Sequence, residues 1–265
     1  MIKEIIDKLV ALLAVSALLA SCSESELWQN PQTEARDGYI MLNFKTEIPA
    51  MQEVVTRAVD PDGGGVQDMT LFCFDSYGLF ISTVKAGVTV QKPGPGEMEG
   101  TFKAEVPENT RTIHFLANQN MDEFKEDSFR NKSESEVMAV LEGSSGRMIY
   151  WGRFACDAGN DSNIAEQMAT SGNSVKLIRN HARISVDNPD NNGHIVITGF
   201  AVCNTNAFGT VAPHHPKKGF DFTWPSSDDP FVTLPVNDAK MSDITDVTSS
   251  MNQYVFECEN SADAP

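Results

Sequence analysis

Apolar and polar residues alternate near the beginning of this chain in the way that is typical of a β-strand. In residues 38–48, Ile40, Leu42 and Phe44 fall on one face and a more polar set falls on the other. Successive side chains of a strand point to opposite faces, so the pattern indicates one buried face and one exposed face. We predict a single strand here, with its apolar face turned toward a protein core.

Several further segments are short, apolar and bounded by turn residues, which indicates additional strands. Residues 69–74 are apolar on both faces, as in a central strand, and a turn at 75–78 leads to a hairpin partner at 79–84. Residues 175–186 predict a long strand whose apolar parity shifts after Leu177, which indicates a β-bulge. The other predicted strands are 101–106, 110–117, 148–154, 195–203 and 253–258.

One segment has the spacing of a helix. Ser133 is placed as an N-cap, and Glu136 three residues later completes a capping box. Gly143 is the predicted stop of the helix. The residues predicted to share its buried face are Val137, Val140 and Leu141.

Strands separated by turns, with one inserted helix, are typical of a β-sandwich. Beyond Asn204 the sequence changes to proline-rich loops with too few strands for an independent sandwich. We therefore predict a mainly β chain with an N-terminal β-sandwich domain at 38–204 and a partial C-terminal β domain at 205–265. A linker at 22–37 precedes the first domain.

The first 21 residues predict export. Lys3 and Lys8 precede an apolar run of 12 residues, 9–20, which is too short to span a bilayer and is typical of a signal peptide. The order Leu-Ala-Ser-Cys that ends at Cys22 resembles the bacterial lipoprotein signal, in which the cysteine is acylated. The acidic residues 23–26 resemble surface-export signals of Bacteroidetes lipoproteins. We predict a signal peptide at 1–21 and lipidation of Cys22.

The net charge of −17 argues against a nucleic-acid partner, because phosphate binding needs clustered Lys and Arg. Cys73, Cys156, Cys203 and Cys258 allow three disulfide connectivities in an exported protein. Free, buried cysteines are the favoured interpretation, because Cys73 and Cys203 belong to apolar strands. With no CxxC motif and no Cys/His spacing for zinc, we predict no metal and no cofactor.

Four features occur in order along the chain: the lipid-attachment signal at Cys22, the pair Arg57-Ala58 after the first strand, the strand and turn at 71–78, and the blocks 177–184 and 199–204. Together they resemble the fimbrillin superfamily of Bacteroidetes fimbriae, to which FimA and Mfa subunits are related. The resemblance implies two transthyretin-like β-sandwich domains and cleavage between Arg57 and Ala58 by an arginine-specific protease. Loss of the first strand would then open a groove that a strand of the next subunit fills.

A full fimbrillin is expected to continue past residues 254–257 into further strands, including the donor strand, so the second domain is expected to be incomplete. The predicted function is a fimbrial subunit, or a fimbrium-associated surface lipoprotein of the outer membrane, that supports cell adhesion and is not an enzyme. Its predicted partners are other fimbrial subunits, the outer membrane through the lipid, and ligands on host or bacterial surfaces.

Other interpretations compete with this one. Trp28, Trp151 and Trp224 are candidate sugar-stacking faces of a surface glycan-binding lipoprotein, or else they pack in the core and in turns. Residues 188–193 resemble the start of a calcium loop, but a hairpin turn explains them equally. The pair His214-His215 is a candidate metal chelate or part of an exposed proline-rich loop.

Overall fold

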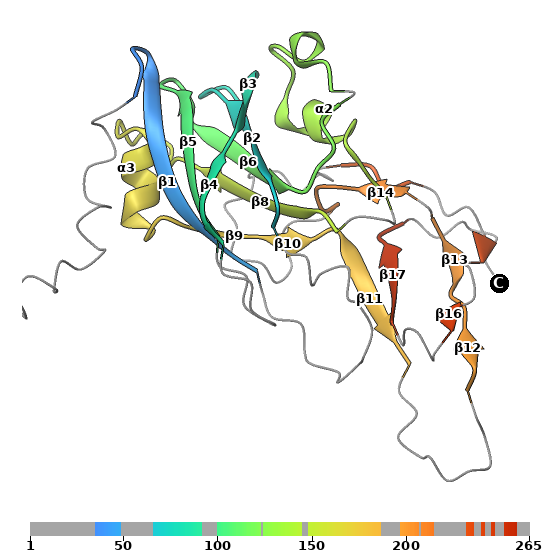
Figure 1. The fold of residues 1–265 in the computed structure, drawn as a ribbon. Coiled ribbons are helices and arrows are strands. Elements are labelled where there is room, and N and C mark those ends of the chain that lie inside the picture. Colours follow the sequence, from blue (N-terminus) through green and yellow to red (C-terminus); the bar gives the residue numbers. More distant parts are fainter. Residues whose placement is uncertain are drawn as a thin grey trace, which may run out of the picture. The chain divides into compact units, whose positions relative to one another are not determined.

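The structure is a computed structural model, and it describes residues 35–48, 66–91, 100–122, 124–144, 148–186, 197–206, 208–214, 232–235, 240–241, 245–246 and 252–258. All of these residues belong to one compact unit, Ala35–Pro265. Its described strands form two larger β-sheets and several two-stranded pairs (Figure 1).

The first sheet has the strand order β4-β5-β1-β9. Within it, β1 (Tyr39–Glu47) lies between β5 (Gly100–Pro107), which is antiparallel to it, and β9 (Ser174–Lys176), which is parallel. β4 (Gly87–Gln91) pairs with the other side of β5. The strand predicted at 38–48 is confirmed, and its predicted apolar face is the buried one.

The second sheet has the order β10-β8-β6-β2-β3, and all its neighbours are antiparallel. Every residue of β2 is buried, which confirms the predicted central strand. The hairpin that follows β2 is also confirmed, since the Asp75 carboxylate accepts hydrogen bonds from the Tyr77 and Leu79 amides at 2.8 and 2.9 Å. The strands are β2 (Met69–Phe74), β3 (Phe80–Lys85), β6 (Thr112–Ala117), β8 (Tyr150–Ala155) and β10 (Ile178–Arg179).

The inner faces of these two sheets share one apolar core. Phe44 of β1 packs edge-on against Phe115 of β6, with 5.0 Å between the ring centroids. The chain is therefore mainly β with a β-sandwich, as the sequence predicts. Other members of this core are Ile40, Leu42, Phe102 and Val106 from the first sheet and Met69, Leu71, Ile113 and Tyr150 from the second.

The chain passes from one sheet to the other at Leu177, between β9 and β10. Leu177 is fully buried, and its amide donates to the Glu47 carbonyl at 2.7 Å. Gly152 of β8 lies directly against this crossing, where an added Cβ would come within 2.6 Å of the Lys176 carbonyl oxygen. The predicted β-bulge is therefore wrong, and the predicted strand at 175–186 is three strands. The alternation of apolar and polar residues shifts after Leu177 because the chain moves from one sheet to the other there, and the face that points to the core changes.

The predicted helix is present but shorter. α2 (Glu134–Met138) begins with the predicted capping box, in which the Ser133 amide donates to the Glu136 carboxylate at 2.9 Å. It ends before Gly143, which lies in β7 (Glu142–Ser144). The prediction that Val140 is buried is wrong, because it lies past the helix end and is 51% exposed. The buried positions near this helix are Val137, Met138 and Leu141.

A second helix, α3 (Ile164–Thr170), was not predicted. Its N-cap Asn163 accepts from the Glu166 amide at 3.0 Å, and the Asn163 amide donates back to the Glu166 carboxylate at 3.2 Å. The Asn-x-x-Glu spacing was the signal that sequence reasoning missed. Ile164 and Met168 of α3 pack into the sandwich core. A short 3-10 helix, η3 (Glu126–Ser128), precedes α2.

The remaining described strands form two-stranded pairs, and β17 confirms the strand predicted at 253–258. The predicted strand at 195–203 is not continuous, since its described part holds β12 and the first residue of β13. The domain boundary between 204 and 205 stays a prediction, and β13 spans it. The pairs are β11 (His181–Ser185) with β17 (Asn252–Phe256), β12 (Gly199–Phe200) with β16 (Thr245–Asp246), β13 (Cys203–Thr205) with β15 (Lys240–Met241), and β14 (Phe208–Thr210) with β7.

Candidate functional site

The place that β1 occupies in the first sheet is the candidate site. β1 pairs with β5 from Tyr39 to Thr46, and with β9 only at its last residues, Lys45 to Glu47. It is the only strand that joins β9 to the rest of this sheet in the described part of the chain. Removing β1 would therefore leave the backbone edge of β5 unpaired and separate β9 from it.

The inner face of β1 is an apolar ridge. Ile40, Leu42 and Phe44 are 7%, 1% and 0% exposed. The Phe44 ring stacks on Phe102 of β5 at a centroid distance of 5.5 Å, and it meets Phe115 of the opposite sheet edge-on. Because Phe44 contacts both layers, an empty β1 position would be a trough lined by aromatic rings.

Polar contacts hold the two ends of β1. At its start, the Arg36 side chain pairs with Glu105 at 2.6 Å and lies over the Tyr39 ring at 4.4 Å. A hydrogen bond from the Arg36 backbone amide lowers the pKa of the Glu105 carboxyl. At its end, the Ser174 hydroxyl donates to the Glu47 carboxylate at 2.6 Å. These contacts are exposed to solvent, so we expect most of the stability of β1 to come from its buried face.

The predicted lipidation site Cys22 and the predicted cleavage site Arg57-Ala58 lie outside the described residues. Both stay predictions. In the sequence they flank β1, with Cys22 before it and Arg57 after it.

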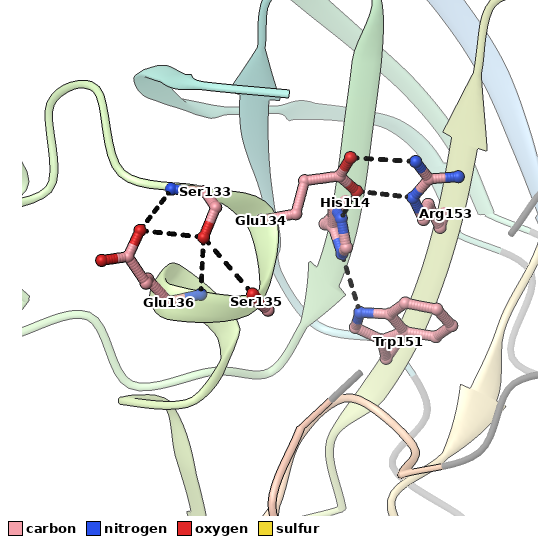
Figure 2. A network of polar contacts seen from close by, with 7 residues as sticks. All are labelled: His114, Ser133, Glu134, Ser135, Glu136, Trp151 and Arg153. Atoms are coloured by element: carbon pink, nitrogen blue, oxygen red, sulfur yellow. Dashed lines mark hydrogen bonds and ion pairs between the residues drawn. The ribbon is translucent and has the colours of Figure 1, made fainter. Parts of the chain in front are cut away.

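A buried polar cluster lies on the outer face of the second sheet (Figure 2). Glu134 of α2 receives two hydrogen bonds from Arg153 of β8, from Nε at 2.6 Å and from Nη2 at 3.0 Å. Its Oε2 also lies 2.7 Å from His114 Nε2 of β6. His114 Nδ1 accepts from the Trp151 indole at 3.1 Å. The cluster thereby ties α2 to two neighbouring strands.

The hydrogen bonds determine the protonation states of His114 and Glu134. Trp151 can only donate, so His114 Nδ1 is an acceptor and Nε2 carries the proton that is given to Glu134. Burial lowers the pKa of His114, which keeps the ring neutral at pH 7. Burial alone would raise the pKa of Glu134, but the hydrogen bonds from His114 and Arg153 outweigh it and lower the pKa to about 2.

The hydrogen bonds of this cluster are those of a structural network and not those of a catalytic site. Both ring nitrogens of His114 are engaged, one by Trp151 and one by Glu134. An imidazole in this state has no nitrogen left to act as a general base. Sequence reasoning missed the cluster, because Glu134 and Arg153 are brought together only by the packing of α2 on the sheet.

Trp151 is fully buried, so it offers no face to a sugar. Trp28 and Trp224 lie outside the described residues. Of the three candidate sugar-stacking tryptophans, the one whose position is described is therefore not available to bind a glycan.

The four described cysteines are free. Cys73 is fully buried, as predicted, and burial raises the pKa of its thiol to about 12. Cys203 is exposed, so the prediction that it is buried is wrong. The apolar run that ends at Cys203 does not form one buried strand, because it is divided between β12 and β13, each in a different two-stranded pair.

The metal alternatives gain no support from the described residues, which contain no group of three or more potential metal ligands. His215 and residues 188–193, which resemble the start of a calcium loop, lie outside the described residues. Among the described helices, none has the length and apolar character needed to cross a membrane.

Comparison with known proteins gives similarity at the level of solved structures. No family model and no curated protein matches the chain. A fimbrial assembly protein from Parabacteroides distasonis aligns with a TM-score of 0.41 and 12% identity, covering 85% of this chain and 79% of that protein. A candidate cell adhesion protein from the same organism aligns with a TM-score of 0.49 and 14% identity, covering 84% and 72%.

The tip fimbrial protein Mfa3 from Porphyromonas gingivalis, with a C-terminal truncation, aligns with a TM-score of 0.45 and 14% identity, covering 84% of this chain and 70% of that protein. These three solved structures are described as fimbrial or cell adhesion proteins, and each is at most 14% identical to this chain. Because these TM-scores are below 0.5, we base the function on the geometry of the described residues.

Proposed function

We propose that this chain is a fimbrial subunit or a fimbrium-associated surface lipoprotein that assembles by protease-triggered donor-strand exchange and supports cell adhesion. The observation that carries the proposal is the position of β1. It is the first strand of the described chain, it fills an aromatic trough between two sheets, and it lies between two other strands of its sheet. A strand so placed is a natural element to release and replace, because a strand from another chain can repair both its backbone pairing and its core contacts.

The sequence around β1 supports the same proposal. A chain acylated at Cys22 would be held at the outer membrane, with β1 attached to the lipid through the linker 22–37. Cleavage between Arg57 and Ala58 would then disconnect β1 and the lipid together from the rest of the protein. If the bond stays intact, the same residues describe a membrane anchor that keeps its own first strand.

Lipidation is tested by growing the producing bacterium with a labelled fatty acid. The wild-type chain is expected to incorporate the label and to fractionate with the outer membrane. Cys22→Ala is expected to lose both properties, because no other residue can be the acyl acceptor of a lipoprotein signal. Equal labelling of the two chains would contradict the assignment of Cys22.

Cleavage and exchange are tested on the purified protein with an arginine-specific protease. We expect a new N-terminus at Ala58, followed by the appearance of oligomers, because loss of β1 exposes the trough. Arg57→Lys is the matched control, since it keeps the charge and removes the cleavage site. Arg36 is also exposed, with 69% of its side chain accessible, so N-terminal sequencing is needed to separate the two sites.

Binding of a synthetic strand provides the second measurement. The cleaved protein is expected to bind a peptide of residues 38–48 and to bind the same peptide with Phe44→Asp far more weakly, because a charge in the aromatic trough is unpaired. A cleaved protein that stays monomeric and binds neither peptide would exclude assembly by strand exchange.

A further inference from the structure

β3 is the last strand of the second sheet in the described part of the chain, where it pairs with β2 alone. An edge strand presents a row of backbone donors and acceptors that another chain can pair with. Here that row is covered. The Phe80 amide donates to the Lys132 carbonyl at 2.8 Å, and the Asn131 amide donates to the Phe80 carbonyl at 3.2 Å.

Glu126 covers the middle of the same edge. Its carboxylate accepts the Thr83 amide at 3.1 Å and also the Thr83 hydroxyl. This amide points away from β2, so it is the group that the carbonyl of an added strand would bind. The carboxylate takes the place of that carbonyl.

Aromatic packing fixes the segment that carries these groups, which we call the strap and define as residues 124–132. The Phe124 ring meets Phe72 of β2 edge-on at 5.2 Å and stacks on Phe129 at 4.8 Å. Near the other end of the strap, Asn131 has a φ of 61°, a left-handed conformation that asparagine tolerates. The strap is therefore held to the sheet by ring contacts as well as by its bonds to the edge.

We propose that the strap guards the edge of the second sheet, and that β3, once uncovered, pairs antiparallel with β3 of a second copy of this chain. A two-fold axis at Thr83 would place Thr83 opposite its own counterpart, so that the two residues exchange both of their N–H···O bonds. In the regular part of β3, the same register sets Val84 opposite Ser82, so no like charges face each other; Ile81 lies at the β-bulge where the pairing with β2 shifts. β3 is thus complementary to itself.

The strap decides which of two contacts between subunits can form. A symmetric β3 pair closes on itself, whereas exchange of β1 joins unlike surfaces and can continue from one subunit to the next. A covered β3 leaves the second kind of contact available and suppresses the first. The proposed role of the strap does not rest on strand exchange, because two β3 strands can pair while β1 stays in its own sheet.

The test is the molar mass of the full chain, measured by light scattering after size exclusion at several protein concentrations. The wild-type chain is expected to elute as a monomer, and Glu126→Ala is expected to shift to twice that mass as the concentration rises. The double variant Glu126→Ala, Thr83→Pro is expected to return to the monomer, because proline removes the outward N–H of the edge. Asp127→Ala is the matched control, since Asp127 is the next residue of the strap and its exposed carboxylate pairs with exposed Arg130.

A folded Glu126→Ala chain that stays monomeric would overturn the proposal, and so would a dimer that persists with Thr83→Pro. If Glu126→Ala does not fold, Phe124→Ala serves in its place, because it releases the ring contacts of the strap with Phe72 and Phe80 and leaves the backbone groups of β3 unchanged. The same dimer and the same loss with Thr83→Pro are expected of it.

Discussion

Replacing Phe44 by alanine is expected to lower the free energy of unfolding by about 3–5 kcal/mol, the usual cost of removing a fully buried phenylalanine. The ring is 0% exposed and contacts Phe102 and Phe115, so its loss leaves a cavity where the two sheets meet. Because these contacts span both layers, neither sheet can close the cavity without shifting the other. The loss is measured by urea unfolding of the full chain.

Lys45→Ala is the matched control for this variant. Lys45 is the next residue of the same strand and is exposed, so its replacement is expected to change the free energy by no more than about 0.5 kcal/mol. Similar losses for the two variants would mean that β1 is held by its pairing alone. The inner face of β1 would then play no special part in holding it.

Replacing Glu134 by alanine is expected to cost about 3–5 kcal/mol, because it takes the carboxylate away from a buried guanidinium. Only 5% of the Arg153 side chain is exposed, and the same carboxylate also receives the proton of His114. Ser135→Ala, one residue further along the same helix and exposed, is the control and is expected to change stability by no more than about 0.5 kcal/mol (Figure 2).

A double variant separates the charge from the packing. Glu134→Leu combined with Arg153→Met removes both charges and keeps apolar volume at both positions. It is expected to recover part of the stability that Glu134→Ala loses, because replacing a whole buried ion pair is often nearly neutral. The recovery is incomplete, because the His114 N–H still lacks its acceptor. A double variant as unstable as the single one would show that the charge of Arg153 does not cause the loss.

Acid is expected to weaken the fold through the same cluster. The folded pKa of Glu134 is about 2, below its ordinary value of about 4.3, so its contribution is present above the ordinary value and is lost as the pH falls toward 2. The pKa of His114 is lowered by burial, and burial also lowers that of His181 to about 4. The unfolded chain therefore binds more protons than the folded chain below about pH 6.5. The free energy of unfolding then decreases as the pH is lowered.

Urea unfolding at several pH values between 7 and 3 measures this dependence. Wild-type stability is expected to decline over the whole range, and Glu134→Gln is expected to make the decline below about pH 4.3 shallower. Part of that decline remains in the variant, because the pKa values of Glu105 and Glu136 are lowered as well. If the wild-type midpoint does not change with pH, the direction of these pKa shifts is wrong.

The alternation of Ile40, Leu42 and Phe44 was enough to place β1 and to choose its buried face. Residues 69–74, which are apolar on both faces, likewise identified a strand with neighbours on both sides. These patterns are local, and they survive folding because a strand has a fixed period of two. The capping box of α2 was also visible in the sequence, since Ser133 and Glu136 satisfy each other within one turn.

Other features could not be predicted because they depend on which elements meet. The parity change after Leu177 has the same sequence pattern as a β-bulge, and only the pairing of β9 with β1 and of β10 with β8 shows that the chain changes sheet. The end of α2 depends on β7, whose extended backbone pairs with a strand more than sixty residues later in the chain. Val140 is exposed for that reason.

The sequence by itself determined the strands with a clear period, the mainly β class and the buried face of β1. The tertiary structure alone decided that Phe44 lies between two sheets, that Glu134 meets Arg153 and His114, and that Glu126 covers Thr83. The physical reason is one of range. Side-chain periodicity is set by neighbouring residues, whereas a buried charge pair or a covered edge exists only after distant segments have packed together.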